Sequence, residues 1–153
     1  MTKTKFQQWV ESFPWVVNED VPWAPPKAPN QRLRFAIVTT GGLYTREQEP
    51  FAIKNRDDVD EGFRVIPSDI SLAELSIAHE HYDHQFAEKD MNVVFPLDRF
   101  RELQEAGEIG SLAPRAYSIS GFIPKPDKIY DTAREIARMM KEDGVEAAFL
   151  TPV

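Results

Sequence analysis

The sequence predicts an α/β protein, a three-layer domain with a mainly parallel sheet that follows a proline-rich N-terminal arm. Short apolar stretches alternate with amphipathic ones from residue 31 to residue 153. A strand–helix–strand order of this kind requires parallel pairing through right-handed crossovers, with helices on both faces of the sheet. The first 30 residues differ, because they contain five prolines and all three tryptophans. We therefore divide the chain into an arm, 1–30, and an α/β domain, 31–153.

The arm is expected to begin with a helix and continue as extended chain. Within residues 1–13, one helical stripe carries Phe6, Trp9, Val10 and Phe13. The prolines that follow favour extended backbone. Large aromatic side chains are unfavourable in water, so we expect the tryptophans to be covered. The cover is either the surface of the domain or a partner to which the arm docks.

Three strands are expected in the first half of the domain. Leu33–Val38 is almost continuously apolar, which is typical of a strand buried on both faces. It ends at two threonines and two glycines, and residues 45–62 are acidic enough to form a surface loop. The other two strands are 63–66, which Pro67 ends, and 75–78.

Two helices and two strands are expected in the second half. The first helix is 96–106, with proline at its first position, Asp98 near its positive end, Gly107 as its stop, and Leu97, Phe100 and Leu103 facing inward. A strand at 117–119 with Phe122 follows. The clearest helix is 127–142, ended by Gly144, with Ile129, Ala133, Ile136, Ala137 and Met140 at helical spacing. The last element is a short apolar strand, 145–150.

The composition excludes several classes of function. The chain has 153 residues and a formal net charge of −7, so it offers little to a nucleic-acid backbone. It contains no cysteine, which excludes disulfides, thiolate metal sites and a cysteine nucleophile within this sequence. No apolar run is long enough for a signal peptide or a membrane span. We therefore expect a cytoplasmic protein that binds neither nucleic acid nor membrane.

All three histidines lie within six residues, in the sequence HEHYDH from His79 to His84. This H-x-H-x-D-H pattern resembles the first metal motif of the metallo-β-lactamase superfamily. His79, His81, Asp83 and His84 would be the candidate zinc ligands, and zinc would lower the pKa of a bound water. That superfamily completes its sites with later histidines, and none follows His84. The alternatives are a partial metal site, a loop whose side chains bond the backbone, and a substrate-binding role without metal.

A second candidate site follows the first strand. In open α/β sheets, ligands bind at the carboxyl ends of strands. Thr40, Gly41 and Gly42 stand at such an end, and glycine lets a backbone approach an anion or a partner closely. The alternative is a tight turn with no ligand.

Several blocks of sequence, taken in order, resemble one family. The blocks are FAIVTTGGL from Phe35, FRVIP from Phe63, HYD from His81, NVVFPLDR from Asn92, Glu102–Leu103, GEIG from Gly107, and LTPV from Leu150. They resemble the selenoprotein B family of the glycine, sarcosine, betaine and D-proline reductases, from about residue 21 onward. The resemblance implies a selenium- or thiol-dependent reductase component that acts on glycine, betaine, sarcosine, D-proline or a related small amine.

The resemblance also implies where the reactive group belongs. In this family a selenocysteine or cysteine follows a strand similar to Ala147–Val153, so the resemblance places the catalytic group just after Val153. Within the chain itself, no catalytic residue and no cofactor are expected. Because a selenocysteine codon can be read as a stop, the chain is expected to be an N-terminal part, inactive alone, whose α/β domain lacks its C-terminal half.

The same resemblance yields a substrate site and partners. Six residues are expected at the site: Thr40, Gly41, Gly42, His81, Tyr82 and Asp83. The expected partners are other reductase subunits, or a second copy joined through the exposed C-terminal strand. Two alternatives stay open: a non-catalytic binding or scaffold subunit, and a metal-dependent hydrolase that uses the histidine cluster.

Overall fold

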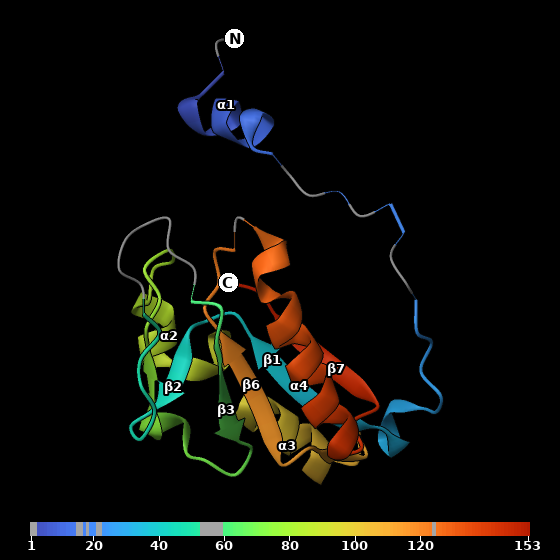
Figure 1. The fold of residues 1–153 in the computed structure, drawn as a ribbon. Coiled ribbons are helices and arrows are strands. Elements are labelled where there is room, and N and C mark those ends of the chain that lie inside the picture. The colour runs from blue at the N-terminus through green and yellow to red at the C-terminus, as the bar shows by residue number, and fades with distance from the viewer. Residues whose placement is uncertain (1–2, 15–16, 18, 21–22, 53–59, 124) are drawn as a thin grey trace.

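The computed structural model describes residues 3–14, 17, 19–20, 23–52, 60–123 and 125–153. Figure 1 shows a central sheet between two helical layers, with α4 (Tyr130–Glu142) over one face and α3 (Leu97–Glu105) over the other. The expected α/β class is confirmed, with a mostly parallel sheet.

The central strand of the main sheet is β1 (Arg34–Thr39). It pairs in parallel with β7 (Ala147–Thr151) along one edge, and with β5 (Ser111–Leu112) and β6 (Arg115–Ile119) along the other. Beyond β6 lies β3 (Phe63–Pro67), which is antiparallel to it. The three parallel strands β1, β6 and β7 therefore end at the same edge of the sheet.

A second sheet of two short strands lies beside the first. β2 (Leu43–Thr45) pairs antiparallel with β4 (Leu75–Ile77). The expected strand 75–78 exists, but the sequence did not predict β2, and it placed Thr45 in a loop. Three residues are too few for a periodic pattern, and the pairing that holds β2 is distant in sequence. The stretches 46–52 and 60–62 carry no helix or strand, and residues 53–59 of the expected loop lie outside the described residues.

Successive side chains of β1 enter two different cores, since side chains alternate across a strand. Ile37 packs on the α3 side with Phe95, Leu97 and Phe100, and Ala36 packs on the α4 side with Tyr117 and Ile136. The prediction of a strand covered on both faces is therefore confirmed. The inward position of Leu103 was wrong, because its side chain is 37% exposed.

The remaining helices are short. They are α1 (Lys5–Ser12), α2 (Gln85–Lys89) and the 3-10 turns η1 (Asn30–Arg32), η2 (Leu72–Glu74), η3 (Met91–Val93) and η4 (Pro126–Ile129). A capping box between Thr4 and Gln7 begins α1. Positive φ at Gly107 and Gly144 follows the ends of α3 and α4, as expected. None of the helices in the described ranges is long and apolar enough to cross a lipid bilayer.

Two described aromatic side chains of the arm stay largely in contact with solvent. Phe6 is 70% exposed, Trp23 is 83% exposed, and no residue of α1 is buried. The ring of Trp9 stacks on Phe6 and contacts Phe13. The expected cover over Trp23 is therefore not found among the described residues, and Trp15 lies outside them.

Candidate functional site at the carboxyl edge of the sheet

Thr40 joins the three parallel strands where they end. Its carbonyl accepts a hydrogen bond of 2.8 Å from the Gly121 N–H, just after β6. Its own N–H donates to the Thr151 carbonyl of β7 at 3.1 Å, and its hydroxyl accepts from the Val153 N–H at 2.9 Å. Thr40 thus lies at the edge where ligands bind in sheets of this kind.

The glycine pair lets the histidine loop approach this edge closely. Gly41 and Gly42 are both buried. Gly42 has a φ of 66°, and its carbonyl accepts from the Ala78 N–H at 2.8 Å. A Cβ atom on Gly42 would lie 2.5 Å from the Ala78 carbonyl oxygen. Protein backbone therefore occupies the close approach that the sequence analysis had assigned to a ligand or partner.

A chain of aromatic rings runs through the loop from Ala78 to His84. The His81 ring stacks on Phe122 with centroids 4.1 Å apart and meets the His79 ring edge-on at 5.9 Å. The Tyr82 ring lies 4.8 Å from His79 and 4.5 Å from His84. Phe122 follows β6 in a left-handed conformation, with φ 58°, rather than within a strand as expected. The loop is thereby fixed as one packed unit beside the carboxyl edge.

His79 is the buried member of this unit, with 4% of its surface exposed. Its Nδ1 accepts a hydrogen bond from the His81 backbone N–H at 3.1 Å. Burial, and then the charges of His81 and His84, lower the pKa of His79 to about 4. Neutral His79 therefore carries its proton on Nε2, since Nδ1 is an acceptor. A Cβ on Gly121 would lie 2.7 Å from that Nε2 atom.

Tyr82 fixes the turn after β1. Its hydroxyl donates to the Gly41 carbonyl at 3.2 Å. Burial raises the pKa of Tyr82 to about 12, so the hydroxyl keeps its proton at neutral pH. Of the six predicted site residues, Tyr82 is the one whose side chain directly joins the histidine loop to the glycine turn.

The four candidate zinc ligands are not arranged around one point. Among the described residues, no group of three or more His, Asp or Glu side chains is placed to hold a metal ion. Asp83 is exposed, and its carboxylate accepts from the backbone and side-chain N–H groups of Gln85 at 3.0 and 3.2 Å. Asp83 and His79 thus bond local backbone, as one of the sequence alternatives held. The geometry does not favour the metal-hydrolase alternative.

The Nε2 atoms of all three histidines are buried and have no hydrogen-bond partner among the described residues. Buried polar atoms without partners are uncommon and mark places where a ligand or water can bond. His84 also lines a cavity of about 590 Å³ that opens between β4 and α2. The other polar side chains around that cavity are Ser76, Glu88, Lys89, Asp90, Asn92 and Asp98. Thr40, Gly41 and Gly42 are not part of its wall.

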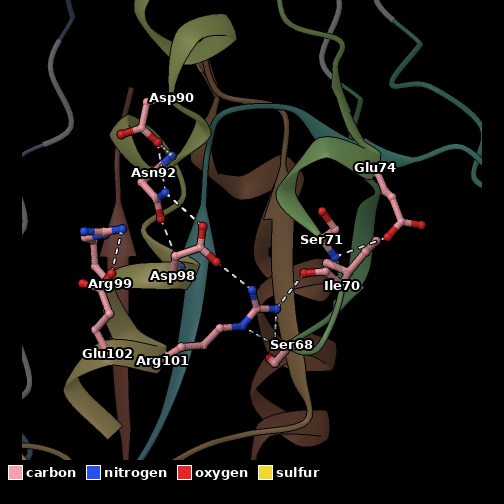
Figure 2. A network of polar contacts seen from close by, with 10 residues as sticks. All are labelled: Ser68, Ile70, Ser71, Glu74, Asp90, Asn92, Asp98, Arg99, Arg101 and Glu102. Atoms are coloured by element: carbon pink, nitrogen blue, oxygen red, sulfur yellow. Dashed lines mark hydrogen bonds and ion pairs between the residues drawn. The ribbon is translucent and has the colours of Figure 1, made fainter. Parts of the chain in front are cut away.

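One wall of the cavity belongs to a polar network that the sequence did not reveal (Figure 2). Asn92 Oδ1 accepts from the Asp98 N–H at 3.1 Å and so satisfies one of the N–H groups that the first turn of α3 leaves free. The Asp98 carboxylate accepts from Arg101 at 2.7 Å, and Arg101 also donates to the carbonyls of Ser68 and Ile70. The network ties α3 to the segment after β3.

Asp98 and Arg99 are adjacent in the sequence but belong to separate ion pairs. Arg99 bonds Glu102 at 2.8 Å, as Figure 2 shows. Adjacent residues of a helix point in different directions, whereas residues three apart share a face. A count at three-residue spacing would have found both the Asp98–Arg101 and Arg99–Glu102 pairs.

Replacing Asn92 by alanine is expected to lower the free energy of unfolding by about 1–2 kcal/mol, because the Asp98 N–H in the first turn of α3 loses its acceptor. Asn92→Asp keeps the accepting oxygen but adds a carboxylate beside Asp90 and Asp98, so it should not restore stability. Urea unfolding measures both variants, with Val93→Ala at the 60% exposed neighbour as the control. A control loss equal to that of Asn92→Ala would mean that the hydrogen bond from the Asp98 N–H to Asn92 does not stabilise the protein.

The comparison with known families decides where this chain belongs. The family model for glycine/sarcosine/betaine reductase selenoprotein B matches residues 1–153. The chain is a member of that family. The resemblance seen in the sequence blocks is thereby confirmed. No solved structure matches the chain.

Three relatives illustrate the match. The D-proline reductase subunit gamma of Acetoanaerobium sticklandii is 35% identical over 130 residues, covering 84% of this chain and 52% of that subunit. The sarcosine reductase complex component B subunit beta of Peptoclostridium acidaminophilum is 29% identical over 153 residues, covering 99% of this chain and 35% of that subunit. The glycine reductase complex component B subunit gamma of Symbiobacterium thermophilum is 29% identical over 151 residues, covering 97% and 35%. This chain therefore spans about half to one third of the length of these relatives.

Proposed function

We propose that this chain is the part of a reductase component that holds a small amino acid or amine, with glycine, betaine, sarcosine and D-proline as the candidate substrates. The family and the names of the relatives support the substrate class. The observation that carries the proposal is the packing of the histidine loop against the carboxyl edge of the sheet, where the imidazole Nε2 atoms have no hydrogen-bond partner among the described residues.

The side chains at this place suit a small zwitterion. An imidazole N–H of His81 or His84 can donate to the substrate carboxylate. The face of an aromatic ring, such as that of Phe122, attracts a methylated or protonated amine. Asp90, on the wall of the cavity that His84 also lines, offers a separate position for that cation. Thr40 and Tyr82 hold the surrounding backbone in place.

The reducing group comes, in this proposal, from another polypeptide segment or subunit. A thiolate or selenolate is the nucleophile that such a reduction requires, and this sequence contains no cysteine. The relatives are named as subunits or components of reductases, several of them complexes. Other reductase subunits are therefore the proposed partners, and the exposed strand β7 is the proposed place of association.

His81→Ala is expected to weaken substrate binding, and to lower turnover in an assembled reductase that contains this chain, by about 10-fold. Loss of one hydrogen bond to a charged group corresponds to about that factor. Titration calorimetry with betaine, glycine, sarcosine and D-proline in turn measures the affinity. Phe86→Ala is the control, since Phe86 is 68% exposed on α2. Unchanged affinity and turnover in His81→Ala would remove His81 from the site.

A further inference from the structure

The edge strand β7 lacks the features that usually protect an edge. Among the described strands, it pairs only with β1. Its five residues, AAFLT, include no charge and no proline. Natural edge strands are usually shielded by charged side chains, proline, a bulge or a covering element, because an open edge recruits other chains. An uncharged edge is therefore expected to be covered in the working protein.

The two faces of β7 both expose large apolar side chains. Phe149 is 42% exposed and contacts Phe100 on the α3 side, with centroids 5.0 Å apart. Leu150, the next residue, points to the α4 side and is 66% exposed. Apolar side chains on both faces are typical of an interior strand of a parallel sheet. A partner that covered one face alone would leave the other exposed.

An apolar groove runs beside Leu150. Its volume is about 220 Å³, and it lies between α4 and the sheet. Its lining includes Val38, Ile119, Ile136, Met140, Ala148 and Leu150. The helical layer over this face is thus incomplete next to β7, where it leaves room for the side chains of one more helix.

The groove favours a strand–helix segment over a second copy of this chain as the occupant of this surface. A two-fold axis that pairs β7 with the β7 of another copy places groove opposite groove, and two hollows do not fill each other. A strand followed by an amphipathic helix fills the groove and continues both layers. The relatives contain further chain that could supply this segment, because this sequence covers only 52% or 35% of their length.

We propose that a strand followed by a helix binds at the open edge of β7 and in the adjacent groove. This segment would come from the part of the reductase polypeptide that the relatives have in addition to the part aligned with this chain. The strand would lie parallel to β7, and the helix would pack in the groove beside α4. The inference rests on the proposed function, because it takes the partner from the same reductase. It would place that segment next to Thr40 and the carboxyl edge.

The test uses the part of the A. sticklandii D-proline reductase subunit gamma that does not align with this chain, co-expressed with the full chain and carrying the affinity tag. We expect capture of the chain and at least about 10-fold slower amide hydrogen exchange at residues 147–151 than in the chain alone. Leu150→Lys should reduce capture at least about 10-fold, whereas Phe86→Lys should not. The two side chains are 66% and 68% exposed, so neither lysine should unfold the chain.

Three results would overturn the proposal: capture without slower exchange at 147–151, equal capture of both lysine variants, or slow exchange at 147–151 in the chain alone together with a dimeric mass. If nothing is captured, amide hydrogen exchange is measured in the intact A. sticklandii subunit. Slow exchange in the strand aligned with β7 supports the proposal, and fast exchange overturns it. Substrate titration of the chain tests the proposed function separately.

Discussion

Replacing Gly42 by alanine is expected to lower the free energy of unfolding by about 3 kcal/mol or more. Its φ of 66° lies in the left-handed region, which costs a residue with a side chain about 1 kcal/mol. The new Cβ would also lie 2.5 Å from the Ala78 carbonyl oxygen and 3.0 Å from the His79 Cβ. These atoms belong to the packed histidine loop, so the backbone must shift, at a cost typical of overpacking.

The variant Gly107→Ala separates the cost of the left-handed backbone conformation from the cost of the steric overlap. Gly107 has a φ of 72°, and a Cβ there meets no atom within 4 Å. This variant should therefore lose only about 1 kcal/mol, the cost of the backbone conformation. Urea unfolding of both variants and the natural chain measures the difference. Equal losses at Gly42 and Gly107 would mean that the histidine loop moves away from the new methyl group at little cost.

The fold was predictable where the pattern is long or continuous. The buried run of β1 and the helical spacing in α4 require only local sequence, and both elements were predicted within a few residues. β2 and β5 were missed, because strands of three and two residues exist only through partners distant in sequence. Spacing also failed for Leu103, which lies on the predicted inner stripe of α3 but near its exposed end.

The candidate site was predictable only in outline. The carboxyl end of β1 and the HEHYDH segment were both named from sequence, and the structure brings them together through the hydrogen bond from Tyr82 to Gly41. The close packing of Gly42 on Ala78 was not predicted. From sequence alone, a glycine that lets another backbone segment come close cannot be distinguished from a glycine that lets a ligand come close. Arg115 was also passed over, yet it forms a two-point ion pair with Asp143 that fixes β6 to the end of α4.

His79 is expected to make the folded protein less stable as the pH falls from about 6.5 to about 4. Its pKa is about 4 in the folded protein, against an ordinary value of 6.5. Between these values the unfolded chain binds more protons than the folded chain, so protonation favours unfolding. Each pKa unit corresponds to about 1.4 kcal/mol, which gives a loss of roughly 2–3 kcal/mol from pH 7 to pH 4.5.

His79→Asn isolates this contribution. The asparagine carbonyl oxygen can still accept from the His81 N–H, but the side chain does not titrate. Urea unfolding at pH 7 and pH 4.5 should show that the natural chain loses roughly 2–3 kcal/mol more than the variant, while the carboxylates titrate alike in both. Equal losses would show that His79 takes up a proton without unfolding. An additional loss of this size in the natural chain would mean that burial, with the charges of His81 and His84, keeps His79 uncharged at pH values where an exposed histidine takes up a proton.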